Sequence, residues 1–257
     1  MLPERRSVNL LKIVTIFAVL AIVHSLSARA EVISQPKFDT AIYTIDFSGY
    51  TGGAVDKWLE TRNYKFERDA RNPSLLGLSI ANSILTLEEK GRMTGFILND
   101  SVNLDKVHTI KINWGVKQYP KEVSYHNKVN NEALMIYIFF GKEKISSGHI
   151  LIPNSPYFIG LFLCQDEQVK FPYKGRYFHE GGRFVCLGKP EPGEMIVSEF
   201  DLDQGFKSYF GKKNTLGITG IAFGLDTSKA GGGGTGAAFI KSIQFVTKPT
   251  VAASAGH

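Results

Sequence analysis

The most regular feature of the chain is the alternation of apolar and polar residues within short segments. In residues 106–116, Ile110, Ile112, Trp114 and Val116 fall on one side of a period of two, and polar or small residues fall on the other. This alternation is typical of a half-buried β-strand. Trp114 lies on the apolar side of the pattern, so we expect its side chain in the core.

A second kind of pattern is a short, continuously apolar run. Residues 133–140 (ALMIYIFF) are rich in β-branched and aromatic side chains and end at Gly141, which predicts a central strand buried on both faces. Six further segments are strand-like and are separated by Gly, Pro and Asn: residues 41–47, 76–87, 158–164, 194–200, 218–225 and 237–246.

Helical signals are few. Asp201 or Asp203 predicts the N-cap of a short helix over residues 204–210, which Gly211 would end. A second short helix is expected near residues 54–59. Many short strands with so little helix predict an all-β fold, namely a single-domain antiparallel β-sandwich of jelly-roll type with one or two short helices.

Two segments show little periodicity of either kind. Residues 51–71 are expected to form a loop or short helix that covers one end of the sandwich. Residues 165–187 are rich in Gly, Lys and aromatic side chains and are expected to form a long loop.

Composition sets the two ends of the chain apart. Basic residues precede an apolar run over residues 13–26, and a small-x-small cleavage sequence follows at 28–30. Residues 1–30 are therefore predicted to be a signal peptide, with an uncleaved membrane anchor as the alternative. We expect the β-sandwich domain to span residues 31–247 and a disordered tail to follow at 248–257. An exported protein of this kind would be periplasmic or extracellular.

The charge balance argues against nucleic acid as a partner. The chain has 30 Lys and Arg residues against 24 Asp and Glu residues, a formal net charge of +6. Four of the basic residues and one acidic residue fall within the predicted signal peptide, which leaves 26 against 23, or +3. A nucleic-acid-binding surface requires a more concentrated basic stripe.

Cys164 and Cys186 are the only cysteines. An exported protein folds in an oxidising compartment, which favours a disulfide between them. The bridge would close a loop of 22 residue steps, worth about 3 kcal/mol in the chain-entropy model. The alternative is two separate buried thiols.

The remaining motifs suggest no cofactor. Gly231–Gly234 lacks the Lys-Ser/Thr pair of a phosphate-binding loop and is expected to form a mobile hairpin loop between the last two strands. Asp201, Asp203 and Asp226 would be the oxygen ligands of a structural calcium ion, but helix capping and a turn explain them equally well.

No catalytic residue is predicted. The histidines show no zinc-binding spacing, and no G-x-S-x-G sequence is present. Glu194 and Glu199 would point to opposite faces of one strand, and the adjacent Asp166 and Glu167 would also point apart. Neither pair suits the two-carboxyl geometry of a glycosidase.

A group of aromatic and basic residues is the candidate ligand-binding site. Tyr157, Tyr173, Arg176, Tyr177 and His179 lie in or beside the loop that the disulfide would close. Exposed aromatic faces next to hydrogen-bonding side chains suit the apolar faces and polar edges of sugar rings. The alternative is that these aromatic residues pack the loop onto the sandwich as a satellite core.

Part of the chain, residues 110–246, resembles an exported bacterial family catalogued as domain of unknown function 3047. Glu132 is what remains here of the acidic residues that family members carry before the second matching block. The resemblance implies a jelly-roll-like sandwich related in shape to carbohydrate-binding modules, and no established activity. The matching blocks are 110–116, with its Trp; 132–140; 218–227, with an Asp-Thr turn; and 237–245.

These observations favour an exported, non-catalytic binding module of the periplasm or cell envelope, with carbohydrate as the first ligand class. One alternative is a structural or assembly protein that docks an envelope protein through an exposed strand edge or through the Gly-rich loop. A second alternative is a hydrolase that acts on a glycan or an ester. A membrane partner is expected only if the N-terminal segment is not cleaved.

Overall fold

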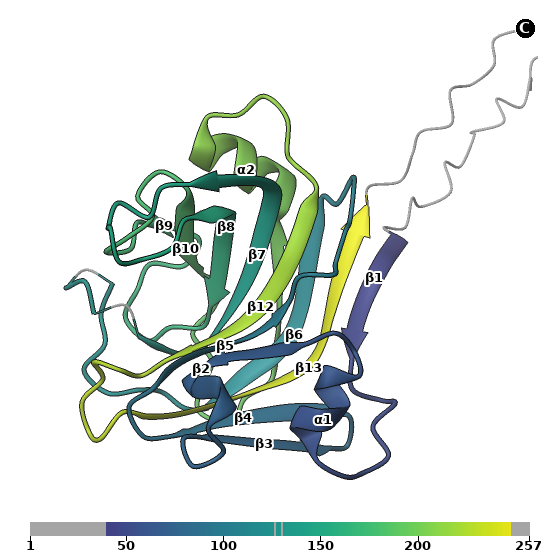
Figure 1. Cartoon of the computed structure of the whole chain (residues 1–257), viewed down its shortest axis with the longest axis vertical. Helices are drawn as coiled ribbons and strands as arrows, with labels where there is room; N and C mark the ends of the chain where they lie inside the picture. The colour runs from purple at the N-terminus through teal and green to yellow at the C-terminus, as the bar shows by residue number, and fades with distance from the viewer. Residues whose placement is uncertain (1–39, 126, 130, 248–257) are drawn as a thin grey trace, which may run out of the picture. The chain divides into compact units, whose positions relative to one another are not determined.

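A computed structural model describes residues 40–125, 127–129 and 131–247, which form a β-sandwich of two sheets (Figure 1). The fold is all-β and of jelly-roll type, with two short α-helices, as the sequence predicts. Sheet A has the order β11-β6-β13-β4-β3, with β1 beside β13; sheet B has the order β2-β5-β12-β7-β8-β10-β9. The predicted signal peptide and the C-terminal tail lie outside the described residues.

The elements have the following bounds. Sheet A contains β1 (Thr40–Asp46), β3 (Leu76–Ala81), β4 (Ile84–Lys90), β6 (Thr109–Gln118), β11 (Ile196–Asp201) and β13 (Thr235–Thr247). Sheet B contains β2 (Lys65–Arg68), β5 (Thr94–Asn99), β7 (Glu132–Ile145), β8 (Ser155–Phe162), β9 (Pro172–Tyr173), β10 (Gly182–Cys186) and β12 (Ile218–Asp226). The helices are α1 (Val55–Glu60), the 3₁₀ turn η1 (Asp69–Arg71) and α2 (Leu202–Phe210).

The main core lies between the two sheets. Alternate residues of each strand enter it, as a pleated backbone requires, and Trp114 on β6 is among the largest side chains that are fully buried. Its indole N–H donates to Ser198 Oγ of β11 at 3.0 Å, so the one polar group of the ring has a partner. The prediction of a core role for Trp114 is confirmed.

A second buried cluster lies on the other face of sheet B. It contains Tyr125, Met135, Phe158, Tyr173 and Phe184, among others, with Tyr137 and Phe139 packed against it. Between Leu134 and Phe140, the even-numbered side chains of β7 face the main core, and Tyr137 and Phe139 face this second cluster. The prediction that residues 133–140 form a strand buried on both faces is therefore confirmed.

Short-range sequence signals place both helices. Asp201 is the N-cap of α2, and its side chain accepts a hydrogen bond from Gln204 N at 2.8 Å. Gly211 ends the helix with φ of 63°, in the left-handed region that favours glycine. The helix expected near residues 54–59 is α1.

Three predictions about local structure are wrong. Residues 76–87 are not one segment but a hairpin of β3 and β4, because Asn82 and Ser83 both adopt positive φ and form a two-residue turn. β7 does not end at Gly141, whose φ of 67° instead accompanies a register shift, and the strand continues to Ile145. Gly231–Gly234 is not in a hairpin, since β12 and β13 belong to different sheets.

The segments expected to be loops contribute to sheet B. Residues 51–71 contain α1, η1 and β2, and residues 165–187 contain β9 and β10. β10 pairs with β8 in parallel, whereas the other strand pairs in the two sheets are antiparallel. A parallel pair needs a long crossover connection, and residues 163–181 supply it. The predicted disulfide is confirmed. Cys164, at the start of this crossover, is bonded to Cys186, the last residue of β10.

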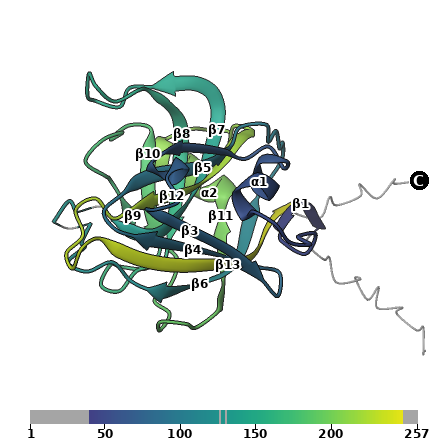
Figure 2. The same ribbon diagram turned by 60° about the horizontal axis from the view of Figure 1, so that its bottom comes forward.

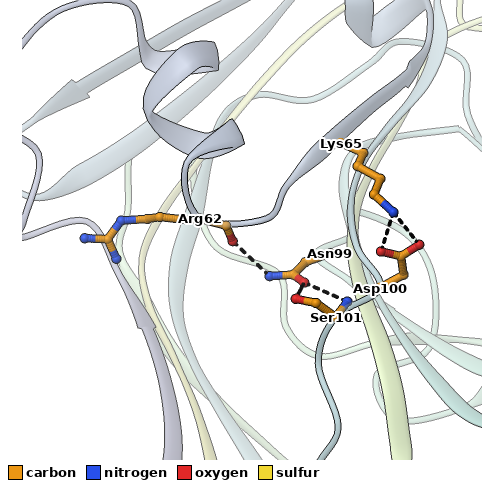
Figure 3. Close-up of polar contacts among 5 residues, drawn as sticks. All are labelled: Arg62, Lys65, Asn99, Asp100 and Ser101. Atoms are coloured by element: carbon orange, nitrogen blue, oxygen red, sulfur yellow. Dashed lines mark hydrogen bonds and ion pairs between the residues drawn. The ribbon is translucent and has the colours of Figure 1, made fainter.

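Polar contacts attach the edge strand β2 to β5 (Figure 3). The Asn99 side chain donates to the Arg62 carbonyl at 3.2 Å and accepts from Ser101 N and Oγ at 3.1 and 2.7 Å. Lys65 at the start of β2 forms an ion pair with Asp100 at 2.7 Å. These contacts fix the edge of sheet B that borders the site below. Within the described residues, no helix has the length and apolar character needed to cross a membrane.

Candidate functional site

The outer face of sheet B holds a hollow of about 650 Å³, called the hollow below. Its floor consists of aromatic side chains from neighbouring strands, with Tyr137 of β7 at the centre. The Tyr137 ring lies 5.7 Å from Phe96, 6.0 Å from Phe139 and 5.4 Å from Phe158, measured between ring centroids. Phe96, Tyr137 and Phe139 are half-buried, so each ring keeps part of its surface accessible from the hollow.

Glycine on the neighbouring strand makes room for the central ring. Gly224 of β12 lies beside Met135 in the sheet register, and a Cβ atom built on it would come within 2.3 Å of the Tyr137 ring. Because real Cβ atoms do not approach other atoms so closely, a side chain at this position would displace the ring. The aromatic floor therefore depends on the absence of a side chain at Gly224.

Two loops form one wall of the hollow. The first is the turn of the β7–β8 hairpin, residues 146–154, which projects from the sheet in Figure 2, and the second is residues 175–178 of the crossover. Ser147 is 2% exposed and joins them, because its carbonyl accepts from Phe178 N at 2.9 Å. Its hydroxyl also donates to the carbonyl of Ile152 at 2.7 Å. The wall is thus tied together by backbone and side-chain hydrogen bonds.

A carboxyl group, Asp226 at the end of β12, lines the hollow beside the aromatic floor. Its Oδ1 accepts from Asn131 Nδ2 at 2.8 Å, Ser228 Oγ at 2.7 Å and Thr94 Oγ1 at 3.2 Å. Burial raises the pKa of Asp226, and the hydrogen bonds from Ser228 and Thr94 oppose that rise. The carboxyl group is therefore held in one place by three neighbouring side chains.

A second carboxyl group, Glu132 at the start of β7, lies directly opposite Asp226. A register shift between Gly224 and Asp226 sets this pairing, and opposite residues in an antiparallel pair share one face of the sheet. Glu132 is 5% exposed, and its Oε2 accepts from Tyr125 Oη at 2.8 Å. Burial raises the pKa of Glu132 well above its usual value, and the nearby Asp226 charge raises it further.

A third carboxyl group approaches from sheet A. Glu89 on β4 is 1% exposed, and neither of its oxygens has a hydrogen-bond partner among the described residues. It lies against Gly236 of β13, where an added Cβ would come within 2.8 Å of its Oε2. Burial raises the pKa of Glu89 well above its usual value, and the charge of Asp226 acts in the same direction.

The structure brings two of the five predicted ligand-binding residues to the hollow. Arg176 and Tyr177 line it, with the Arg176 guanidinium 5.4 Å from the Tyr177 ring centroid. Tyr157 instead packs beneath α2, Tyr173 is 6% exposed within the second buried cluster, and His179 is exposed outside the hollow. Tyr173 thus occupies the satellite-core position that the sequence left open as the alternative.

Sequence reasoning missed the floor of the hollow and its carboxyl groups. Phe96 lies on β5, which the sequence patterns did not indicate, and Tyr137 lies inside an apolar run that was assigned to the core as a whole. The sequence did contain one signal for this site. A tyrosine within an otherwise apolar run indicates which face of the strand can accommodate a hydroxyl group. The pairing of Glu132 with Asp226 depends on a register shift between distant strands, which a single sequence does not reveal.

The three aspartates considered as calcium ligands are used elsewhere. Asp201 caps α2, Asp203 forms an ion pair with Lys207 at 2.8 Å, and Asp226 belongs to the hollow. In the part of the chain that the structure describes, no three His, Cys, Asp or Glu side chains are arranged to hold a metal ion.

Comparison with known proteins yields structural similarity only. No family model matches the sequence, and no curated protein matches it. Among solved structures, the chain is similar to endoglucanase 3 from Trichoderma harzianum, a member of family GH12, with 9% identity and a TM-score of 0.34 over 82% of this chain and 98% of that one. It is also similar to the xyloglucanase domain of NopAA from Sinorhizobium fredii, which was solved in complex with cellobiose. The identity is again 9% and the TM-score 0.34, over 81% of this chain and 98% of that one.

A third similar structure is the endo-1,4-β-glucanase CelB2. The identity is 11% and the TM-score 0.30, over 72% of this chain and 100% of the CelB2 chain. Similarity at this level carries no information on the ligand or activity of the present protein.

Proposed function

We propose that this protein is an exported, non-catalytic binding module that holds a saccharide in the hollow on sheet B. The observation that carries the proposal is the floor of the hollow, where Phe96, Tyr137 and Phe139 form a group of half-buried rings. Soluble proteins usually bury large aromatic side chains, so three that remain accessible in one concavity mark a binding surface.

The chemistry of the hollow suits a sugar. A pyranose ring presents apolar C–H groups on its faces and hydroxyl groups at its edge, and the aromatic rings match the faces. Polar side chains line the border of the floor, including Asp226, Asn154 and Ser155, and such groups match the hydroxyl groups of a sugar. A hollow of about 650 Å³ is within the usual range for small-molecule sites and has room for a short oligosaccharide.

Binding is favoured over catalysis because of how the carboxyl groups lie. Asp226 lines the hollow, but Glu132 is almost fully buried and its Oε2 is engaged by Tyr125. A glycosidase needs both carboxyl groups at the scissile bond. In the arrangement seen here, only one of the two is in contact with the space where a ligand would lie.

The test is to titrate the purified, oxidised protein with a panel of oligosaccharides and to measure binding by isothermal titration calorimetry. We expect selective binding that Tyr137→Ala weakens about tenfold or more, since the variant removes the central ring of the floor. Tyr43→Ala is the matched control, because Tyr43 is also half-buried but lies on β1 and packs on Phe245, outside the hollow. Absence of binding to every saccharide, or equal loss in both variants, would contradict the proposal.

One observation favours a second function, the hydrolysis of a glycan. Glu132 and Asp226 occupy opposite positions of an antiparallel pair, where Cβ atoms lie about 4.5–5.5 Å apart. Retaining glycosidases hold their two carboxyl groups about 5–5.5 Å apart. Burial raises the pKa values of both groups, and the Asp226 charge raises the pKa of Glu132 further.

The same saccharide panel distinguishes the two functions. Hydrolysis would release reducing ends with time, and Glu132→Gln would abolish this release while leaving saccharide binding within about threefold. If reducing ends do not accumulate above the level of the Glu132→Gln variant for any saccharide that binds, the hydrolytic function is excluded and the binding function stands.

A further inference from the structure

Four cationic side chains stand at the border of the hollow, and together they are called the cationic rim. They are Arg68, Lys128, Arg176 and Lys229, and all four are exposed. They come from four separate segments: the end of β2, the connection before β7, the crossover, and the connection after β12. Segments distant in the sequence thus place like charges around one concavity.

Few negative charges on the protein offset the cationic rim. Within the described ranges, no carboxylate forms an ion pair with Arg68, Lys128 or Lys229. Of the two acidic residues that line the hollow, Glu67 is already paired with Arg71 at 2.9 Å. The other, Asp226, carries a single negative charge when it is ionised. Among the described residues, Arg68, Lys128 and Lys229 therefore outnumber Asp226, the one carboxyl group lining the hollow that is not already in an ion pair.

The backbone holds two of these cations in unusual conformations. Arg68 has φ of 53° and Lys128 has φ of 58°, a region that non-glycine residues adopt rarely. Arg68 is followed by Asp69, whose side chain accepts from Thr94 N at 2.9 Å, and Lys128 lies in a turn closed by hydrogen bonds between the backbones of Ser124 and Val129. Surrounding contacts thus fix both positions.

The cations also lie close to the aromatic floor. The Arg68 guanidinium is 5.6 Å from the Phe96 ring centroid, and its charge acts to lower the pKa of Tyr137 against the larger effect of burial. The charge of Lys229 acts likewise on the pKa of Asp226. A ligand that stacks on Tyr137 would therefore lie beside positive charge from the β2 and β12 side of sheet B.

From this juxtaposition we propose that the saccharide bound in the hollow is acidic, carrying carboxylate, sulfate or phosphate groups on its sugar residues. The proposal rests on the proposed saccharide-binding function and specifies its ligand class. A neutral sugar gains ordinary hydrogen bonds from Arg and Lys side chains, whereas an anionic group gains stronger, charge-assisted hydrogen bonds from each cation it reaches. A saccharide is favoured over nucleic acid because the cations surround one hollow instead of following an extended groove.

The decisive probe is a pair of ligands that differ only in charge. Oligogalacturonate and its methyl ester share one backbone, and the ester removes the negative charge of every sugar residue. We expect the acid to bind about tenfold or more tightly than the ester in low salt, and the difference to shrink as sodium chloride is raised. A sulfated oligosaccharide and its desulfated form make a second pair, which distinguishes sulfate from carboxylate as the preferred anion.

Variants of the rim identify where the charge is recognised. Arg68→Gln and Lys229→Gln should each weaken binding of the acidic ligand about three- to tenfold and leave binding of its neutral partner unchanged. Lys213→Gln and Lys241→Gln are the matched controls, since both lysines are exposed and lie outside the hollow. Far-ultraviolet circular dichroism of each variant checks that the fold is retained.

The outcomes separate this inference from the proposed function. Equal binding of the acidic and neutral members of both pairs would overturn the acidic ligand and leave saccharide binding in place. No binding of either member would overturn both. Binding of single-stranded DNA at least as tight as that of the acidic saccharides would replace the saccharide with a nucleic-acid ligand. Equal losses in the rim variants and the control variants would show that the recognition depends on overall charge and not on the hollow.

Discussion

Glu89 offers a direct test of the buried carboxyl groups, because its side chain is 1% exposed and neither oxygen is hydrogen-bonded within the described residues. The substitution Glu89→Gln keeps the volume of the side chain and removes its ability to ionise. We expect the variant to become more stable relative to the parent as the pH rises. The cause is burial, which raises the pKa of Glu89 well above the usual 4.5 in the folded protein.

The sign and size of the effect follow from proton linkage. A carboxyl group whose pKa is raised by folding stabilises the folded state fully below the pKa of the unfolded chain. That contribution is lost as the pH rises from 4.5 through the folded pKa. Each pH unit in this window costs about 1.4 kcal/mol. As the pH rises from 4.5 toward the folded pKa, the parent should therefore lose stability at up to this rate, and the Glu89→Gln variant should not.

The measurement is urea-induced unfolding followed by tryptophan fluorescence, at half-unit steps from pH 4.5 to 7 and constant ionic strength. Glu132 and Asp226 also have pKa values raised by burial, so the parent will show its own dependence on pH. The informative quantity is the difference in free energy of unfolding between parent and variant at each pH. Glu88→Gln is the reference, because Glu88 is the exposed neighbour on the same strand.

Parallel stability curves for the parent and Glu89→Gln would refute the reasoning. They would mean that Glu89 ionises in the folded protein with its usual pKa, so that its carboxyl group is solvated or paired in solution. A difference that shrinks as the pH rises would contradict the sign of the linkage and indicate a favourable partner for the ionised form.

Three further predictions concern the disulfide, the floor of the hollow and a helix. Replacing both Cys164 and Cys186 by Ser should lower the free energy of unfolding by about 3 kcal/mol, as measured by urea unfolding, because the bond closes a loop with a sequence separation of 22. Gly224→Ala should cost about 1–3 kcal/mol and weaken saccharide binding in calorimetry, because the added Cβ displaces the Tyr137 ring; unchanged binding would contradict the role of that ring. Asp201→Ala should lower the thermal stability by about 1 kcal/mol through loss of the N-cap hydrogen bond, and a change within error would show that the cap is replaced by water.

The sequence predicted the parts of the fold that depend on local signals. Alternation identified the strand that holds Trp114, and a continuous apolar run identified the central strand β7. The capping residue and glycine around α2 are equally local, and all were confirmed. The two cysteines were paired correctly because two cysteines in one chain allow a single intramolecular bridge.

The remaining elements depend on contacts between distant segments. β10 is a strand because β8 lies beside it in parallel, whereas its own sequence predicts part of a loop. The turn at Asn82 and Ser83 was missed because neither residue is glycine, although both adopt positive φ. The hollow could not be predicted from the sequence for the same reason. Its floor and rim combine side chains from several strands, and local sequence patterns do not predict the order of these strands in the sheet.

The disulfide has a consequence for the wall of the hollow. Cys164 and Cys186 close the crossover and β10 into a covalent ring, and residues 175–178 of the wall belong to that ring. A protease that cuts the exposed part of the crossover once would therefore leave a nicked protein whose two pieces remain one molecule. The same closure would allow residues 165–181 of the crossover to be exchanged as a unit, because both cysteines of the bond lie outside the exchanged residues. The wall of the hollow could then change in sequence while the strands beneath it keep their register.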